Sequence, residues 1–384
     1  MKKRIVHYTL GFHYPYKGGV ETDIGNIYNM TKEFYEHIVV YKHGGNTCGE
    51  IQTISGISKE TMIKRRSNFC ENFKYLNRVL DKNTKEKGVP LYSEEIDATT
   101  IDRINSLQPD IFINYGCEGL EKLIASLYSN AKRNFLKIQF PNGTEMKIIK
   151  EFLPNLEIIC YNKEHIDMIN NPLGLFGLKN KVHFLPFVYN ETIFNNANKK
   201  KYSSGTINFL YTGRFSEIKR IKELINVFEY FIEKEKQDIT LTLVGGSFDK
   251  EYEKEVIEKV NNINRIKIIP WKNHEELTTF YKQFDCVIIP SYYESFCSSL
   301  LEALACGTTC IINTTFIDYW TNGKVINGCH LLNTEVSSEE TLKAGVEYLL
   351  RNKKDVLNNM DYSKEIEEVF SYRVNKDKWL KLFE

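Results

Sequence analysis

The chain has 384 residues, of which 42% are hydrophobic, and this is enough for two domains that each bury a core of ordinary size. Fifty-one basic residues nearly balance fifty acidic ones, so the formal net charge of +1 gives no global field that would attract nucleic acid. No segment approaches the ~20 apolar residues that span a bilayer, and we expect a cytoplasmic protein whose membrane contact, if any, is peripheral.

Short apolar strands alternate with amphipathic helices in the first half of the chain. Residues 4–10 are typical of a strand rather than a signal peptide, because the apolar run is short and contains His7. The pattern predicts helices at 20–35, 101–107 and 119–129, and further strands at 37–42, 110–116, 135–140 and 157–162. This alternation predicts a parallel sheet covered on both faces.

A basic stretch interrupts this pattern. Between Lys59 and Lys87, nine Lys and Arg residues stand against four acidic residues. The stretch is typical of a solvated loop and helix face, and it is also compatible with a patch that meets anionic lipid or an anionic acceptor. Both interpretations stay open from the sequence.

Residues 195–205, NNANKKKYSSG, lose all apolar periodicity and are predicted to be a linker. The pattern then restarts, with predicted strands at 207–213, 239–246, 266–271, 286–291 and 309–314, and helices at 222–235, 251–262, 274–283, 298–307 and 376–384. We therefore predict an α/β protein with two Rossmann-like, doubly wound parallel-sheet domains, 1–195 and 205–365. The terminal helix, 366–384, would pack back on the first domain.

Nine cysteines are scattered along the chain without CxxC pairs or histidine partners at zinc spacing. Several lie inside apolar segments such as EIICY and FDCVII. We expect reduced and mostly buried thiols and no metal site.

Glycines and cations follow several predicted strands, where open parallel sheets bind ligands. Gly19 opens a helix in GGVET, and Gly213, Arg214 and Lys219 lie in YTGRFSEIKR; Gly245 ends LVGG and Trp271 follows IKIIP. A helix start with free N–H groups and two cations five residues apart could hold a diphosphate, and a tryptophan could stack on a base or sugar. A plain loop, surface solvation and core packing explain each feature equally well when it is taken alone.

The segment SYYESFCSSLLEALACG, residues 291–307, carries two acidic residues after the apolar strand CVIIP. Glu294 is predicted in the turn at the strand end and Glu302 about one turn into the next helix. Leucines and alanines surround Glu302 in the sequence and leave it little polar company. A carboxylate in such surroundings is costly unless a polar group meets it, and we expect that group to be a ligand.

In this order, the motifs resemble the retaining glycosyltransferases of family 4, which have the GT-B fold of two facing Rossmann-like domains. The resemblance covers most of the chain, through GGVE, LPFVYNETIF, YTGRFSEIKR, LVGG, IKIIPWKNHEEL, PSYYESFCSSLLEALACG and FSYRVNKDKWLKLFE. The two glutamates separated by seven residues are its most specific element.

The resemblance implies a role for each matching residue. Glu294 would hold hydroxyls of the transferred sugar, and Arg214 and Lys219 would neutralise the departing diphosphate. Glu302 would hold the ribose hydroxyls of the nucleotide. The remaining donor-binding positions are Gly19, Gly213, Gly245, Trp271, Ser295, Phe296, Cys297, Ser298 and Asn142.

The resemblance also implies the reaction. A hexose-type sugar would move, with retention of configuration, from a nucleotide-diphosphate donor to a glycan, a lipid-linked saccharide or a protein acceptor. A UDP-sugar is favoured over a GDP-sugar as the donor. No cofactor or divalent metal is expected, since cations and a helix N-terminus would stabilise the leaving group.

Departures from the family pattern keep alternatives open. Asn142 stands where a histidine is common in the first domain, and it cannot be protonated. Glycine is common where Cys297 and Pro270 stand. The alternatives are a non-catalytic GT-B partner or glycan-binding protein, and another GT-B enzyme such as a nucleotide-sugar epimerase.

Overall fold

The chain forms two compact units in the computed structural model. One comprises Met1–His13, Tyr28–Phe184 and Phe383, and the other comprises Tyr14–Ile27, Leu185–Leu382 and Glu384. The structure describes residues 2–11, 18–43, 58–61, 104–116, 123, 125–126, 129–138, 146, 149–150, 153–161, 163–170, 176–292, 294, 296–312, 330–331, 339–359 and 361–384. The domain limits given by the sequence stay a prediction.

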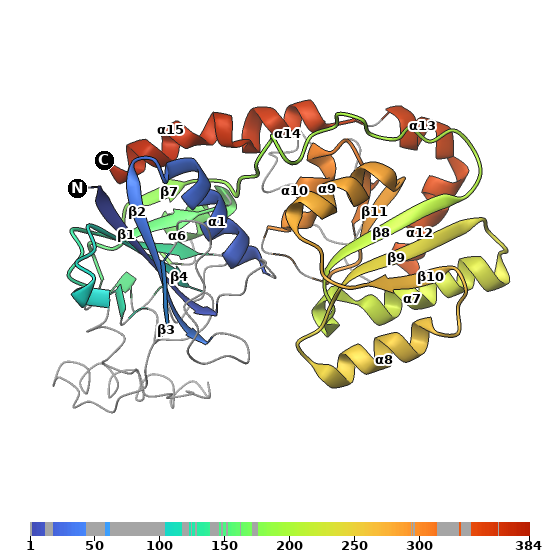
Figure 1. Ribbon diagram of the computed structural model, residues 1–384, viewed down its shortest axis with the longest axis horizontal. Coiled ribbons are helices and arrows are strands. Elements are labelled where there is room, and N and C mark those ends of the chain that lie inside the picture. The colour runs from blue at the N-terminus through green and yellow to red at the C-terminus, as the bar shows by residue number, and fades with distance from the viewer. Residues whose placement is uncertain are drawn as a thin grey trace. The chain divides into compact units, whose positions relative to one another are not determined.

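The first unit contains a seven-stranded parallel sheet in the order β3-β2-β1-β4-β5-β6-β7 (Figure 1). The five strands predicted in this half are confirmed, whereas the short strands β3 and β7 were not predicted. The strands are β1 (Lys3–Gly11), β2 (Tyr35–His43), β3 (Ser58–Thr61), β4 (Ile111–Gly116), β5 (Arg133–Ile138), β6 (Glu157–Cys160) and β7 (Val182–Phe184).

The helices of the first half include α1 (Gly19–Thr31) and α6 (Lys163–Asn170). The prediction of a helix as far as residue 35 is wrong, because α1 ends at Thr31. The backbone N–H of Phe34 donates to the carbonyl of Thr31 in a tight turn. Tyr35 then begins β2, where its buried ring meets the edge of Phe383 at a centroid distance of 5.5 Å.

The second unit contains a six-stranded parallel sheet in the order β10-β9-β8-β11-β12-β13. Its strands are β8 (Ile207–Arg214), β9 (Ile239–Gly246), β10 (Ile266–Ile269), β11 (Cys286–Ile289), β12 (Thr309–Ile312) and β13 (His330–Leu331). The predicted fold class, α/β with two parallel-sheet domains, is confirmed. Buried parallel strands are apolar along their whole length, and this property made them recognisable in the sequence.

The helices of the second unit begin where the sequence supplies caps. Asn273 and Glu276 form a reciprocal capping box at α9, and the Asp249 side chain accepts from two backbone N–H groups at α8. The helices are α7 (Ile221–Glu229), which continues as a π-helical turn (Tyr230–Lys234), α8 (Lys250–Val260), α9 (His274–Gln283), α10 (Ser298–Ala305), α12 (Glu339–Arg351), α13 (Lys353–Asn359), α14 (Ser363–Phe370) and α15 (Tyr372–Phe383). A 3-10 turn, Glu217–Lys219, precedes α7.

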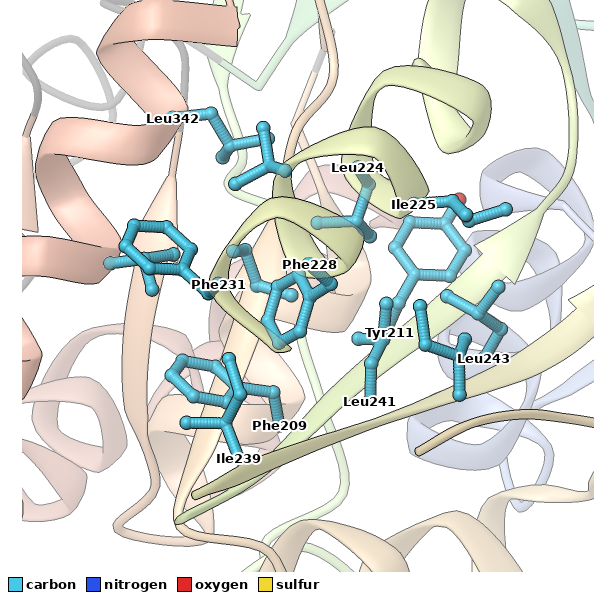
Figure 2. Close-up of a cluster of buried hydrophobic side chains, with 14 of the residues drawn as sticks. Phe209, Tyr211, Leu224, Ile225, Phe228, Phe231, Ile239, Leu241, Leu243 and Leu342 are labelled. Carbon is cyan, nitrogen blue, oxygen red and sulfur yellow. The ribbon is translucent and has the colours of Figure 1, made fainter. Parts of the chain in front are cut away.

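Helix α7 covers one face of this sheet. Its apolar stripe packs on alternate residues of β8 and β9, as Figure 2 shows for Phe228 above Phe209 and Ile239. Side chains alternate along a strand, so Thr212 points to the opposite face from Tyr211. Thr212 there meets the Tyr281 hydroxyl of α9 at 2.8 Å. Helices α7 and α9 therefore cover opposite faces of one sheet.

The predicted linker has neither helix nor strand between residues 195 and 205, as the sequence indicated. It is held to α9 rather than free. Lys200 N donates to the carbonyl of Lys282 (3.0 Å), and the Lys199 ammonium donates to the carbonyl of Phe284 (2.5 Å). The segment is therefore part of the second unit.

Five cysteines have described side chains, and all five are buried free thiols, as predicted: Cys160, Cys286, Cys297, Cys306 and Cys310. Among the helices the structure describes, none has both the length and the apolar character to cross a bilayer.

Candidate active site

The candidate site lies at the topological switch point of the second sheet. From β8 the chain proceeds to β9 and β10 on one side, and β11 pairs with β8 on the other. Open parallel sheets bind ligands beyond the carboxyl ends of the strands at such a point. Lys219 follows β8 and Glu294 follows β11, so two predicted catalytic residues come from the two strands that flank it.

Lys219 and Glu294 are in direct contact. The Lys219 Nζ lies 2.5 Å from Glu294 Oε1, and the Ser291 hydroxyl donates to the same oxygen at 2.6 Å. The backbone N–H of Tyr292 donates to the carbonyl of Ile218 (2.8 Å) and so ties the turn after β11 to the 3-10 turn that carries Lys219. The pair is thus positioned by the main chain as well as by its own attraction.

The geometry of the pair leaves capacity for a ligand. Among the described residues, both hydrogen bonds to the Glu294 carboxylate go to Oε1, and Oε2 can accept from a hydroxyl. The side chains of Lys219 and Glu294 are 21% and 10% exposed. An anion that reached Lys219 would compete with Glu294 for the ammonium, which couples anion binding to the freedom of the carboxylate.

The glycines at the ends of β8 and β9 allow an unusually close backbone approach. Gly213 and Gly245 are register partners with φ of +148° and +151°. A Cβ on Gly245 would lie 1.9 Å from the Gly213 carbonyl oxygen, and one on Gly246 would lie 3.0 Å from Trp271 Nε1. The structure therefore brings Gly213, Gly245 and Trp271 together at one edge of the sheet.

Arg214 is the last residue of β8 rather than a residue after it. Its carbonyl accepts from the Tyr211 hydroxyl (2.9 Å), and its guanidinium lies 5.9 Å from the centre of the Phe248 ring. The side chain is exposed at the strand end. Within the part of the chain described, the ion pair of the site is made by Lys219 and not by Arg214.

Glu302 is buried in α10, at 5% exposure, and has polar partners. The expectation that little polar company surrounds it is wrong. The Tyr281 hydroxyl donates to Oε2 at 3.1 Å, and His274 Nε2 lies 3.8 Å from Oε1. These groups come from α9, whereas the apolar neighbours in the sequence belong to the same helix as Glu302.

Burial dominates the protonation of this cluster. It raises the pKa of Glu302 to about 8, against a smaller lowering by the Tyr281 hydrogen bond, and it lowers the pKa of His274 to about 4. It also raises the pKa of Tyr281 well above its usual value. Without a ligand, Glu302 is largely protonated and His274 neutral near pH 7.

This protonation gives a testable linkage. Because Glu302 binds its proton more tightly in the folded chain than in the unfolded one, the free energy of unfolding falls as pH rises from about 4.5 to about 8. The substitution Glu302→Gln is expected to remove this fall, which is on the order of a few kcal/mol. Urea denaturation of both proteins across pH 4.5–9 measures it. Parallel curves for the two proteins would contradict the assignment.

The start of α10 is shaped by backbone and packing. Cys297, its N-cap, is buried with a left-handed φ of 65°, a conformation that glycine adopts without steric cost. The Phe296 ring stacks on Phe187 (5.0 Å) and meets the edge of Phe370 (5.9 Å). The donor contacts predicted for Phe296, Cys297 and Ser298 stay a prediction.

The other predicted positions are more isolated or not described. Gly19 begins α1 and has open space where a Cβ would stand. Asn142 and Ser295 lie outside the described residues, as does the basic region 59–87 beyond the end of β3. In the part of the chain that is described, no three His, Cys, Asp or Glu side chains gather so that they could hold a metal ion.

Four polar residues of the site were missed from the sequence: Thr212, His274, Tyr281 and Ser291. Tyr281 lies among the apolar positions of its helix, where an aromatic residue is typical of core packing. Ser291 could have been found, because a serine three residues before a turn glutamate is a common local partner.

Comparison with known proteins agrees with this arrangement. Residues 192–366 match the family Glycosyl transferases group 1. An uncharacterised glycosyltransferase of Methanocaldococcus jannaschii, MJ1178, is 23% identical over 374 residues, which are 94% of this chain and 92% of that protein.

Two solved structures are similar over nearly the whole chain. Sucrose-phosphate synthase from Thermosynechococcus elongatus is 14% identical with a TM-score of 0.67, covering 100% of this chain and 98% of the other. S. aureus TarM, in a complex described as containing UDP and alpha-GlcNAc-glycerol, is 14% identical with a TM-score of 0.68, covering 99% of each chain. The fold is that of the GT-B glycosyltransferases, and the protein is a glycosyltransferase.

Proposed function

We propose that this glycosyltransferase moves a hexose-type sugar from a UDP-sugar to a glycan, a lipid-linked saccharide or a protein acceptor, with retention of anomeric configuration and without a divalent metal. The contact between Lys219 and Glu294 at the switch point carries the proposal. It joins a cation suited to a diphosphate with a carboxylate suited to sugar hydroxyls at the sheet edge where ligands bind.

Each residue of the site has a role in this proposal. Glu294 Oε2 accepts from hydroxyls of the transferred sugar. Lys219 and Arg214 neutralise the charge that develops on the departing diphosphate, which is the electrostatic work that a metal ion performs in other enzymes. Gly213 and Gly245 let the backbone approach the donor closely.

The proposed reaction keeps the sugar's configuration because attack and departure take place on one face. The acceptor oxygen forms a bond to the anomeric carbon as the bond from that carbon to the diphosphate oxygen breaks. The departing phosphate oxygen takes the acceptor's proton. The cations at Lys219 and Arg214 stabilise the leaving diphosphate throughout.

The choice of UDP is supported by TarM, whose complex contains that nucleotide. Trp271, which borders the glycines of β9, is placed to stack on the base or the sugar. Loop side chains set the acceptor, and one or two such contacts suffice to discriminate between acceptors.

A donor screen tests the proposal directly. Wild type, Arg214→Ala and Lys219→Ala are each mixed with UDP-, GDP-, ADP- and dTDP-hexoses, and the shift in melting temperature and the slow hydrolysis of the donor are recorded. A UDP-hexose is expected to stabilise wild type, and each substitution should weaken its binding by roughly 10- to 100-fold because a charge-assisted contact to phosphate is lost.

Arg351→Ala is the matched control. Arg351 is 77% exposed on α12 and pairs with Glu347 in its own helix, so the same change in net charge is made away from the site. If no nucleotide sugar stabilises wild type, the diphosphate role of Arg214 and Lys219 is wrong. Activity lost in excess EDTA, or an inverted product by NMR, would overturn the metal-free or the retaining part alone.

A further inference from the structure

A chain of hydroxyl groups leads from the end of β8 to Glu302. The Thr212 hydroxyl meets the Tyr281 hydroxyl at 2.8 Å, and Tyr281 donates to Glu302 Oε2 at 3.1 Å. Thr212 is 6% exposed and Tyr281 is fully buried. No role has been given above to Thr212 or Tyr281.

The chain has a direction that depends on the charge of Glu302. A phenol has one hydrogen, so when Tyr281 donates to the carboxylate it can only accept from Thr212. The order is then Thr212 to Tyr281 to Glu302, with each hydroxyl polarised toward the carboxylate. A protonated Glu302 can instead donate to Tyr281, and the order reverses.

Tyr281 is itself fixed in place. The Thr308 hydroxyl donates to its backbone carbonyl at 2.5 Å, which joins the last turn of α9 to the end of α10. Its ring lies 6.2 Å from Phe194, whose ring also meets His274 at 5.5 Å. The hydroxyl therefore meets Glu302 from one direction.

We propose that Thr212 and Tyr281 are positioning residues that hold Glu302 in its ionised, hydrogen-bond-accepting form, and that they thereby control nucleotide affinity. The proposal rests on the proposed function, in which Glu302 accepts from the ribose hydroxyls. A carboxylate accepts from both hydroxyls of a ribose, whereas a carboxylic acid gives up one lone pair and adds a competing donor. Donor binding is therefore expected to strengthen as Glu302 ionises.

Few other groups near Glu302 titrate in the working range. His274, from α9, has a pKa lowered to about 4, and burial raises the pKa of Cys306, at the end of α10, to about 11. Lys282 of α9 bonds to Asn195. The buried α14 residues that pack toward α10 are uncharged, and β11 and β12 contribute only the thiols Cys286 and Cys310. Between pH 6.5 and 9, Glu302 is the group expected to change charge.

The first arm of the test needs no ligand. The pH dependence of unfolding is measured for wild type, Tyr281→Phe, Glu302→Gln and the double variant. Loss of the Tyr281 hydroxyl is expected to move the titration of Glu302 upward by about one pH unit, because a hydrogen bond to the charged form is lost. In the Glu302→Gln background, Tyr281→Phe should move nothing. An unmoved titration in the single variant overturns the proposal.

The second arm measures UDP affinity by calorimetry between pH 7 and 9. Wild-type affinity should rise with pH, and Tyr281→Phe should bind UDP roughly tenfold more weakly at pH 7, with the difference closing at higher pH. A purely structural role for Tyr281 would weaken binding equally at every pH, and that result also overturns the proposal. If UDP fails to bind wild type, the proposed donor is wrong while the first arm still decides the coupling.

Two further variants guard the interpretation. Thr212→Val keeps the shape of the side chain and removes only its hydroxyl, so it should shift the titration in the same direction by less. It also decides the proposal if Tyr281→Phe does not fold. Tyr252→Phe removes a buried phenol hydroxyl on the opposite face of the same sheet and should leave the titration unmoved.

Discussion

Replacing Glu294 by glutamine is expected to lower kcat by roughly 100- to 1000-fold while UDP binding stays unchanged or becomes tighter. Glutamine keeps the shape of the side chain but not the charge that holds the sugar hydroxyls. Because Lys219 loses the carboxylate that competes for its ammonium, a diphosphate meets a less occupied cation. Initial rates and UDP calorimetry on the same preparation separate the two effects.

The fold should survive this change. The side chain of Lys219 is 21% exposed, so water can replace the lost partner, and a partly exposed pair contributes little to stability. Glu217→Gln is the matched control: Glu217 lies two residues before Lys219, is 71% exposed and pairs with Lys222. If Glu294→Gln lowers kcat and UDP affinity by the same factor, Glu294 organises the diphosphate site instead of the sugar.

Local sequence signals predicted what depends on local order. The apolar runs of the second half give every strand from β8 to β12 near its observed position. The rule that parallel strands end at one edge then brings Lys219 near Glu294 across 75 intervening positions, and the structure joins the two side chains directly.

Pairing between elements was harder to predict. The hydroxyl chain depends on which face of β8 carries Thr212 and which face of α9 carries Tyr281, and neither is written in a local pattern. The same holds for His7 of β1, which is fully buried and bonds to His37 of β2 (2.9 Å) and Tyr115 of β4 (3.1 Å). A polar residue inside a predicted strand does not announce the partner that makes its burial tolerable.

Glycine positions lie between these two cases. The repeated arrangement of a strand followed by glycine indicated ligand approach at Gly213 and Gly245. The sequence could not show that these two glycines are register partners whose backbones nearly touch. The requirement for glycine is therefore structural as well as functional.

The substitution Gly245→Ala is accordingly expected to destabilise the protein by about 3–5 kcal/mol or to prevent folding. Its Cβ would lie 1.9 Å from the Gly213 carbonyl oxygen, where no rotation of a side chain can relieve the clash, and φ of +151° is itself unfavourable for alanine. Relief requires β8 and β9 to separate at the end where both carry site residues. Urea denaturation and soluble yield measure the effect.

Gly19→Ala is the control for this prediction, because a Cβ at Gly19 meets nothing within 4 Å at the start of α1 and should leave stability nearly unchanged. Stability of Gly245→Ala within about 1 kcal/mol of wild type would mean that the two strands can move apart there at little cost. Their carboxyl ends would then be a flexible rather than a rigid wall of the donor site. A large loss instead supports a rigid edge whose geometry is set by the backbone before the donor arrives, as electrostatic stabilisation of a leaving group requires.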